Sequence, residues 1–287
     1  MNFDFSDEQK FLRDEARKFL TAKCTTAEVR EVLDDDAKSH HEDVWKQVVE
    51  MGWLGTAIPE EHGGLGLGML ELCVIAEELG RALAPIPFAS SVYFFAEAVK
   101  LAGSDTQKSE LLPKIADGSA IGCIAASEGP GPVEAGKLKT EFKDGTLTGT
   151  KIPVTDGDVA THAVVLAKDG SGSSLVVVAL DQDGVSRSSV ETIEPTRSHA
   201  EITFNGASAE RLGGQGDGEA LYAEILNRAA VLLAFEQVGG ASVCLDMATD
   251  YAKERQAFGR PIGGNQAIKH KLAEMYVKNE VARSNSY

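Results

Sequence analysis

Apolar side chains recur at helical spacing through the first third of the chain. Ser6 and Gln9 have the spacing of a capping box, which predicts the start of a helix. The apolar face of this helix consists of Phe11, Leu12, Ala16, Phe19 and Leu20. Helical spacing returns at 44–49, from Met69 to Leu79 with Gly80 as the predicted end, and from Ser90 to Ala102. We therefore predict an all-α N-terminal domain over residues 1–118.

The middle of the chain changes to the alternating period of β-strands. Leu138 to Thr150 alternates and contains Asp144-Gly145, a strong signal for a tight hairpin. Short apolar or alternating runs follow at 163–167, 175–180 and 200–204. Strands that succeed one another without intervening helices indicate an antiparallel sheet and not a βαβ nucleotide fold. The predicted fold class is therefore α+β, with an antiparallel β-barrel or sandwich domain over residues 119–212.

A long helix is predicted after the glycine-rich linker at 213–218. Its apolar pattern runs from Leu221 to Ala252, and Gly259 and Pro261 end it. Asn265 can cap a second helix, which meets no stop signal before Tyr287. We therefore expect a C-terminal helical-bundle domain over residues 217–287, with only its first two helices present.

Charge and cysteine usage narrow the class of protein. The chain has 28 basic and 44 acidic residues, a net charge of −16, which argues against nucleic acid or an anionic membrane surface as a partner. The four cysteines have no C-x-x-C spacing and suit reduced thiols. The N-terminus has no apolar signal-peptide region, and no uncharged apolar run is long enough to cross a bilayer. We expect a cytoplasmic protein.

Common nucleotide, metal and hydrolase motifs are missing from the sequence. The glycine clusters at 63–68, 129–131 and 213–218 do not have G-x-G-x-x-G spacing, and no G-x-x-x-x-G-K-[ST] loop or G-x-S-x-G elbow occurs. The six histidines show no metal-ligand spacing, so no metal site is predicted.

The most informative stretch joins the two C-terminal helices. It reads Glu254-Arg255-Gln256-Ala257-Phe258-Gly259-Arg260-Pro261-Ile262, followed by Gln266-Ala267-Ile268. Arg255 either complements the helix dipole at the end of the first helix or binds a diphosphate with its planar guanidinium. Phe258 either packs on a cofactor ring or fills the corner between the helices. The residues by themselves leave both alternatives open.

This stretch resembles the acyl-CoA dehydrogenase family, in which E-R-x-x-F-G-x-x-I followed by Q-A-I joins two long helices. The segment PEEHGGLGLGMLELCVIAEELGRALAP at Pro59–Pro85 is similar to the N-terminal helical domain of the same family. The resemblance implies a three-domain subunit that binds FAD without a Rossmann fold. It also implies an acyl-CoA substrate, an electron-transferring flavoprotein as electron acceptor, and a homo- or hetero-oligomer in which a neighbouring subunit reaches the FAD diphosphate.

The family's cofactor residues carry over to five positions. Arg255 matches the diphosphate arginine, Phe258 and Gln266 match residues that line the cofactor from the neighbouring subunit, and Ser127 and Thr155 match hydroxyls beside the flavin. One four-residue run and two single positions depart from the family pattern. The family usually continues T-E with P-x-x-G-S-D, whereas this chain continues with Gly129-Pro130-Gly131-Pro132; Pro153 replaces a common Trp, and Ala257 replaces a common hydroxyl.

No catalytic base can be assigned from the sequence. The family reaction needs a carboxylate that removes the α-proton of the thioester. A minority of members place it on the first long helix of the C-terminal domain, where two alignments give Ala229 or Asn227; the majority position would lie beyond Tyr287. Glu224 and Glu236 flank this region and are interpreted as helix-surface charges. Three hypotheses remain: a truncated acyl-CoA dehydrogenase, a base-deficient subunit of a heteromeric one, and a non-catalytic flavin- or acyl-CoA-binding protein.

Overall fold

The computed structural model describes residues 5–35 and 37–286. Part of the expectation that the N-terminus carries no signal peptide rests on residues 1–4, which lie outside this described part. The chain forms two compact units: one from Met1–Thr25, Leu70–Ala84 and Ala230–Tyr287, the other from Thr26–Met69 and Pro85–Ala229. Each unit is therefore assembled from segments that lie far apart in the sequence.

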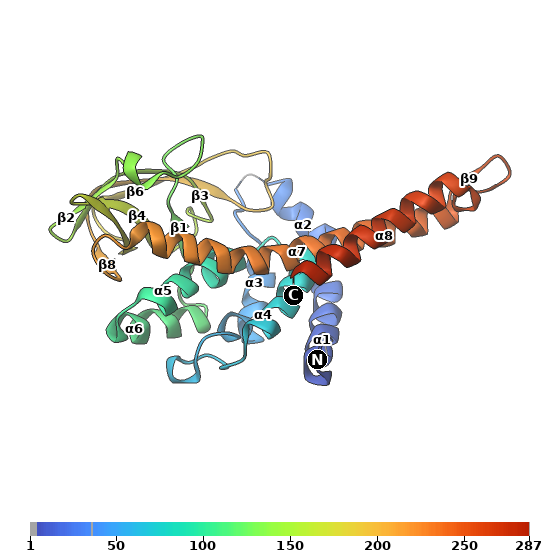
Figure 1. Cartoon of the computed structure of the whole chain (residues 1–287), viewed down its shortest axis with the longest axis horizontal. Coiled ribbons are helices and arrows are strands. Elements are labelled where there is room, and N and C mark those ends of the chain that lie inside the picture. The colour runs from blue at the N-terminus through green and yellow to red at the C-terminus, as the bar shows by residue number, and fades with distance from the viewer. Residues whose placement is uncertain (1–4, 36, 287) are drawn as a thin grey trace. The chain divides into compact units, whose positions relative to one another are not determined.

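The first unit is helical. Its elements are α1 (Asp7–Lys23), α4 (Met69–Ala82), most of α7 (Gly218–Glu254), β9 (Gln256–Ala257), β10 (Arg260–Pro261), η5 (Ile262–Gly264) and α8 (Gln266–Ser286). The predicted capping box is confirmed, because Ser6 accepts from the Gln9 backbone and Gln9 from the Ser6 backbone. The second half of α7 and α8 form a helical hairpin, with β9 and β10 at its turn (Figure 1). Both long C-terminal helices were thus predicted from their apolar period.

The contact between α4 and α7 corrects one prediction. Gly80 does not end α4, which continues to Ala82. A Cβ atom on Gly80 would lie 2.0 Å from the Glu236 carbonyl oxygen, and one on Gly239 would lie 2.0 Å from the Glu77 carbonyl oxygen. Glycine is therefore required here by the close approach of two helix backbones, and not by a helix end.

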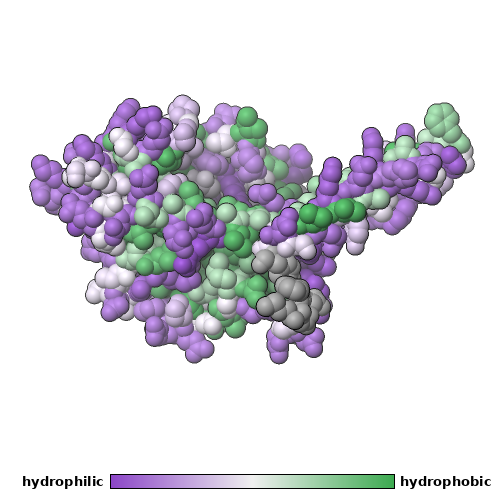
Figure 2. Space-filling view, viewed as in Figure 1, coloured by the Kyte–Doolittle hydropathy of each residue, from purple (hydrophilic) through white to green (hydrophobic). Residues whose placement is uncertain are grey.

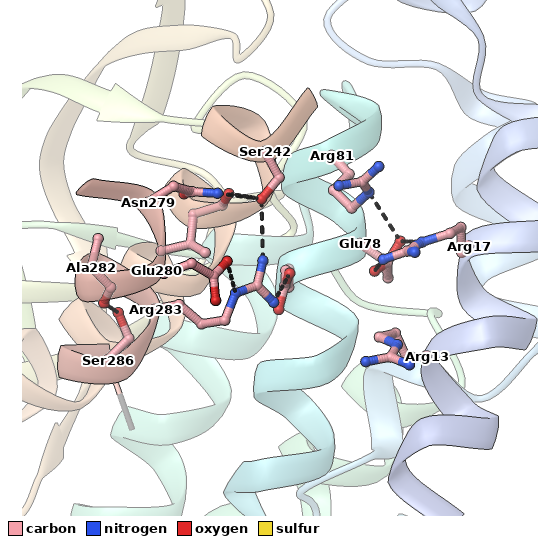
Figure 3. Close-up of polar contacts among 12 residues, drawn as sticks. Arg13, Arg17, Glu78, Arg81, Ser242, Asn279, Glu280, Ala282, Arg283 and Ser286 are labelled. Atoms are coloured by element: carbon pink, nitrogen blue, oxygen red, sulfur yellow. Dashed lines mark hydrogen bonds and ion pairs between the residues drawn. The ribbon is translucent and has the colours of Figure 1, made fainter. Parts of the chain in front are cut away.

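Two buried carboxylates and their partly exposed arginine partners tie the helices of this unit together (Figure 3). On α4, the Glu78 carboxylate accepts two hydrogen bonds from Arg17 of α1, at 2.7 and 2.9 Å. The neighbouring Glu77 carboxylate lies 2.7 Å from the Arg283 guanidinium of α8. Ser242 of α7 accepts hydrogen bonds from both Arg283 and Asn279. Both carboxylates are almost completely buried, so these partners offset their desolvation.

The second unit packs helices on a β-sheet. Its helices are α2 (Thr26–Leu33), α3 (Glu42–Glu50), η1 (Trp53–Gly55), η2 (Glu60–His62), the π-helix η3 (Ala89–Ala96), α5 (Glu97–Ala102), α6 (Asp105–Ala116), η4 (Ala135–Lys137) and the start of α7. Its strands are β1 (Gly122–Ala125), β2 (Glu141–Lys143), β3 (Thr146–Thr155), β4 (His162–Asp169), β5 (Gly172–Ala179), β6 (Val185–Ser189), β7 (His199–Ser208) and β8 (Glu210–Leu212). The described strands form one sheet with the order β6-β7-β3-β2-β4-β5-β8, and β1 pairs with β4.

Most strand pairs are antiparallel, but the sheet is mixed. The hairpin between β2 and β3 turns at Asp144-Gly145, where both residues have positive φ angles, as the sequence predicts. In contrast, β1 runs parallel to β4, and β2 meets β4 in a parallel pairing. Side chains of β4 alternate between two cores. Ala163, Val165 and Ala167 join the core shared with β3 and β7, whereas Val164 and Leu166 join the core under the helices.

The length of α7 raises a question about membranes. Among the described residues, α7 is the one helix whose length and apolar composition would suffice to cross a bilayer. Glu236 interrupts its apolar stretch, and Gly239 within that stretch contacts α4. A long helix of a helical bundle can have the same length and apolar composition, and α7 contacts both α4 and α8.

Candidate functional site

The segment that follows β1 is held against the end of β3 by backbone hydrogen bonds. The Ile152 N–H donates to the Ser127 carbonyl oxygen, and the Gly129 N–H donates to the Ile152 carbonyl oxygen, both at 2.9 Å. The Ser127 hydroxyl donates to the Gly129 carbonyl oxygen at 3.0 Å. Ser127 is half-buried. Its hydroxyl therefore sits in a fixed turn with its lone pairs left for another donor.

The buried Lys151 of β3 forms hydrogen bonds with the same segment. The Lys151 ammonium on β3 donates to the Ala126 carbonyl oxygen at 3.0 Å and to Glu128 Oε1 at 2.8 Å. The Lys151 side chain is completely buried, and that of Glu128 is 14% exposed. The Glu128 carboxylate also accepts the backbone N–H groups of Lys139 and Thr140. Lys151 thus holds the residues on both sides of Ser127.

The charges of this pair are set by burial and by hydrogen bonds. Burial by itself raises the pKa of the Glu128 carboxyl, but hydrogen bonds from Lys151 and from two backbone N–H groups outweigh it and hold the pKa at about 2. Burial lowers the pKa of Lys151, and the hydrogen bond to Glu128 only partly offsets this. The ionised Glu128 carboxylate therefore stabilises the charged form of the buried Lys151 side chain.

An open cavity of about 270 Å³ lies beside Ser127 and is lined by residues 126–134 and 137–139. The loop Gly129-Pro130-Gly131-Pro132 forms one of its walls. Gly129 and Gly131 have φ angles of +135° and +106°, and a Cβ on either would meet no atom within 4 Å. The lining of this cavity therefore includes backbone groups and the Ser127 hydroxyl.

Thr155 lies at the end of β3, three residues beyond Ile152. A register shift between Lys151 and Val154 leaves Ile152 and Pro153 outside the ladder with β7, and pairing resumes at Val154 and Thr155. Thr155 pairs with His199 of β7, and its Oγ1 lies 3.2 Å from His199 Nε2. Pro153, which stands where many family members have a tryptophan, is exposed.

Asp156 follows Thr155 and is a buried carboxylate, 2% exposed, with a φ of +56°. The Ser90 hydroxyl donates to it at 2.5 Å. Burial raises its pKa to about 6, and the hydrogen bond from Ser90 opposes this rise. Because the folded pKa exceeds the ordinary 3.8, the folded protein binds this proton more tightly than the unfolded chain does. The resulting stability is complete below pH ~4 and is lost as the pH rises through about 6.

We expect Asp156→Asn to stabilise the protein at pH 8 by about 1–3 kcal/mol, because it removes a desolvated charge and asparagine tolerates the left-handed backbone. The gain should shrink at pH 5. Urea unfolding at both pH values measures it. Asp144→Asn is the matched control, since Asp144 also has a left-handed φ of +50° but is exposed. Equal effects of the two substitutions, or a gain that does not depend on pH, would contradict the prediction.

The turn of the α7–α8 hairpin carries the other predicted site residues. Arg255 follows the last residue of α7 and is exposed; within the described part of the chain its guanidinium has no ion-pair partner. Phe258 is fully exposed with a φ of +53°, so it does not fill the corner between the helices. Gln266 is the exposed first residue of α8. Asn265 precedes α8, and its side chain accepts from Arg260 at 2.7 Å.

The helix positions considered for a catalytic base carry no acid. Ala229 is completely buried and Asn227 is exposed, both on the first part of α7. Glu224 is bound by Arg228 at 2.7 Å, and Arg228 also bonds Glu97 at 2.8 Å. Glu236 is half-buried farther along α7.

The predicted cofactor residues form two groups. Ser127 and Thr155 lie near the C-terminal end of β3, whereas Arg255, Phe258 and Gln266 lie around the turn of the α7–α8 hairpin in the other unit. Lys151, Glu128 and His199 were missed from the sequence. Of these three, only Glu128 could have been noticed in the sequence, because it directly follows Ser127, a predicted cofactor residue.

Two models of known domains match the chain. "Acyl-CoA dehydrogenase, N-terminal domain" matches residues 6–119, and "Acyl-CoA dehydrogenase, C-terminal domain" matches residues 216–287. Acyl-CoA dehydrogenase IpdE2 of Mycobacterium tuberculosis is 31% identical over 281 residues, which cover 97% of this chain and 74% of that protein. The chain thus spans about three quarters of this relative's length.

Solved structures agree with these matches. A Tcur3481-Tcur3483 steroid ACAD G363A variant is 34% identical with a TM-score of 0.85, and the alignment covers 96% of this chain and 74% of that one. A chain of the ChsE4-ChsE5 complex from Mycobacterium tuberculosis is 27% identical with a TM-score of 0.85 over 98% of this chain and 76% of that one.

Proposed function

Because this chain belongs to the acyl-CoA dehydrogenase family, we propose that it takes part in the FAD-dependent α,β-dehydrogenation of an acyl-CoA thioester. The observation that carries this proposal is the match of two family domains, 6–119 and 216–287, on either side of a β-sheet. The chain is accordingly an oxidoreductase of the kind that acts on CH–CH donors. The domain boundaries that we propose are 1–118, 119–212 and 217–287.

Members of this family are flavoproteins, and the residues present fit FAD. The Ser127 and Thr155 hydroxyls would meet the ring edge, and Gln266 would line the cofactor from the neighbouring subunit. The exposed Phe258 offers an aromatic face, and Arg255 offers the diphosphate a guanidinium that has no ion-pair partner among the described residues. Bound FAD would supply the two-electron oxidant for forming the α,β double bond. The protein's part is to hold the ring and the thioester against each other and to exclude water.

The residues at the two α7 positions considered for a base support a second candidate function. Proton removal from the α-carbon needs a carboxylate, and α7 has an alanine and an asparagine at the two positions considered. A base-deficient subunit that shares its sites with a related chain would explain this, and the likeness to a chain of the ChsE4-ChsE5 complex supports it. A non-catalytic flavin- or acyl-CoA-binding protein is the third possibility. Co-purification of a second, related chain would distinguish the heteromeric subunit from the non-catalytic binding protein.

The partners that we propose are an acyl-CoA, an electron-transferring flavoprotein and further subunits. Apolar side chains are exposed along the α7–α8 hairpin. They are Met247, Tyr251, Phe258, Met275, Tyr276, Val277 and Val281. Figure 2 shows hydrophobic surface at the tip of this hairpin. Exposed apolar surface of this kind favours association with another subunit. We propose a cytoplasmic location, which the four free thiols and the assignment of α7 to the C-terminal domain support.

Arg255→Ala is expected to weaken FAD binding far more than Arg260→Ala. Loss of one charge-assisted hydrogen bond should raise the dissociation constant of FAD by roughly 10- to 150-fold, or about 1.5–3 kcal/mol. Arg260→Ala removes only an exposed contact with Asn265. Titration of the apoprotein with FAD, followed by flavin fluorescence, measures both. Equal losses would show that the assignment of Arg255 to the diphosphate is wrong, and no flavin binding by the unaltered chain would overturn the proposed function.

A further inference from the structure

Thr155 and His199 form a pair across two strands of the sheet. They are direct partners in the antiparallel register of β3 and β7, and Thr155 Oγ1 lies 3.2 Å from His199 Nε2. Both side chains are half-buried. Within residues 5–35 and 37–286, the His199 ring is the one side chain that bonds the Thr155 hydroxyl. The direction of this hydrogen bond therefore decides what the hydroxyl can offer to a ligand.

The other ring nitrogen of His199 fixes that direction. Nδ1 lies 3.0 Å from the Arg197 carbonyl oxygen and 3.4 Å from Thr192 Oγ1. The Thr192 hydroxyl donates its own hydrogen to the Glu194 carbonyl oxygen, so its oxygen faces Nδ1 as an acceptor. A carbonyl oxygen can only accept, and Nδ1 must therefore carry a hydrogen. In the neutral ring, Nε2 then has a lone pair and accepts the hydrogen of Thr155.

We propose that His199 sets the hydrogen-bond polarity of the Thr155 hydroxyl, so that this hydroxyl meets the proposed flavin ring as an acceptor. This proposal rests on the proposed function for the placement of the flavin, but its first step concerns only the protein. A threonine hydroxyl has one hydrogen and two lone pairs. With the hydrogen held by His199, only the lone pairs remain for a ligand. His199 is accordingly a positioning residue that acts through Thr155.

An accepting hydroxyl distinguishes two states of a flavin. The ring nitrogens of a flavin carry more hydrogens in the reduced form than in the oxidised form. An acceptor beside the ring therefore binds the reduced form more tightly, because it meets an N–H where the oxidised form presents a second acceptor. The Ser127 hydroxyl, whose hydrogen is held by the Gly129 carbonyl oxygen, has the same polarity.

The first test reads the tautomer of His199 in the full chain without flavin. Long-range 1H–15N spectra of histidine-labelled protein at pH 8.5, where histidine rings are generally neutral, distinguish the two nitrogens. We expect the Nδ1–H tautomer for His199, with its signals assigned by their loss in His199→Phe. Thr155→Val should shift the Nε2 signal of His199 and leave the other histidines unchanged. An Nε2–H tautomer would overturn the proposal whether or not the chain binds FAD.

The second test uses bound FAD. His199→Phe removes the acceptor and frees the Thr155 hydrogen, so the preference for reduced over oxidised flavin should fall about three- to tenfold. This corresponds to a midpoint potential lower by ~15–30 mV for a two-electron couple. In a Thr155→Val background the same substitution should shift the potential by much less. A loss of thermal stability with an unchanged potential would mean that His199 has only a structural role and would overturn the proposal.

Discussion

The 287-residue chain loaded with FAD is expected to dehydrogenate acyl-CoA thioesters about 10²–10⁴-fold more slowly than the same chain assembled with a subunit that supplies a carboxylate. This factor is the typical contribution of a positioned general base. Neither Ala229 nor Asn227 can remove a proton. The Glu224 carboxylate lies 2.7 Å from the Arg228 guanidinium, and this ion pair would have to break before Glu224 could act as a base.

Steady-state turnover with an artificial electron acceptor measures this difference. The chain is assayed alone and after addition of a co-purified related chain. Fast turnover by the chain alone would refute the prediction and would indicate an acid that we have not assigned, with Glu236 as the first candidate. Glu236→Gln should then abolish turnover, whereas Glu224→Gln on the same helix serves as its matched control.

Glu128→Ala is expected to lower the free energy of unfolding by about 3–5 kcal/mol. The substitution leaves the Lys151 ammonium completely buried with a single carbonyl partner and removes the acceptor of two backbone N–H groups. An unpaired buried charge is costly, because the interior solvates it poorly. The double variant Glu128→Ala/Lys151→Met should recover part of the loss, since it removes both charges.

Glu134→Ala provides the matched control for this substitution. Glu134 lies in the same loop and pairs with Lys137 at 2.8 Å, but both side chains are largely exposed. An exposed ion pair contributes at most about 1 kcal/mol, so this variant should unfold at nearly the same urea concentration as the unaltered chain. Similar losses for Glu128→Ala and Glu134→Ala, measured by urea unfolding at pH 7, would show that burial of Lys151 does not matter.

The Glu128–Lys151 pair also predicts resistance to acid in this part of the sheet. Because the folded pKa of Glu128 is lowered to about 2, its contribution is complete above the ordinary pKa of 4.5 and is lost only as the pH falls through about 2. Asp156 behaves in the opposite sense, since its folded pKa is raised. The two carboxylates therefore have opposite effects on the pH dependence of stability, because Glu128 is paired with a lysine and bonded by backbone N–H groups, whereas desolvation dominates at the fully buried Asp156.

Several features of this protein were predictable from the sequence because local chemistry decides them. The capping box at Ser6 and Gln9 and the positive φ angles at Asp144-Gly145 depend on residues a few positions apart. The order of helices, sheet and helices follows from apolar periodicity. The hairpin motif from Glu254 to Ile268 indicated the family, which the matching domains then confirmed.

Other features exist only in the tertiary structure. Whether Gly80 ends a helix or admits a neighbouring backbone depends on Gly239, far along the chain. The sequence pattern alone would predict an exposed strand position for Lys151, whereas the structure buries it beside Glu128. Likewise, the sequence marks His199 only as the start of a strand, and the strand register places it opposite Thr155. The sequence by itself determined the elements and the family, because periodicity, capping and turn chemistry are local. Only the tertiary structure decided which charges are buried and which hydroxyl hydrogens are free, because both depend on partners brought together by folding.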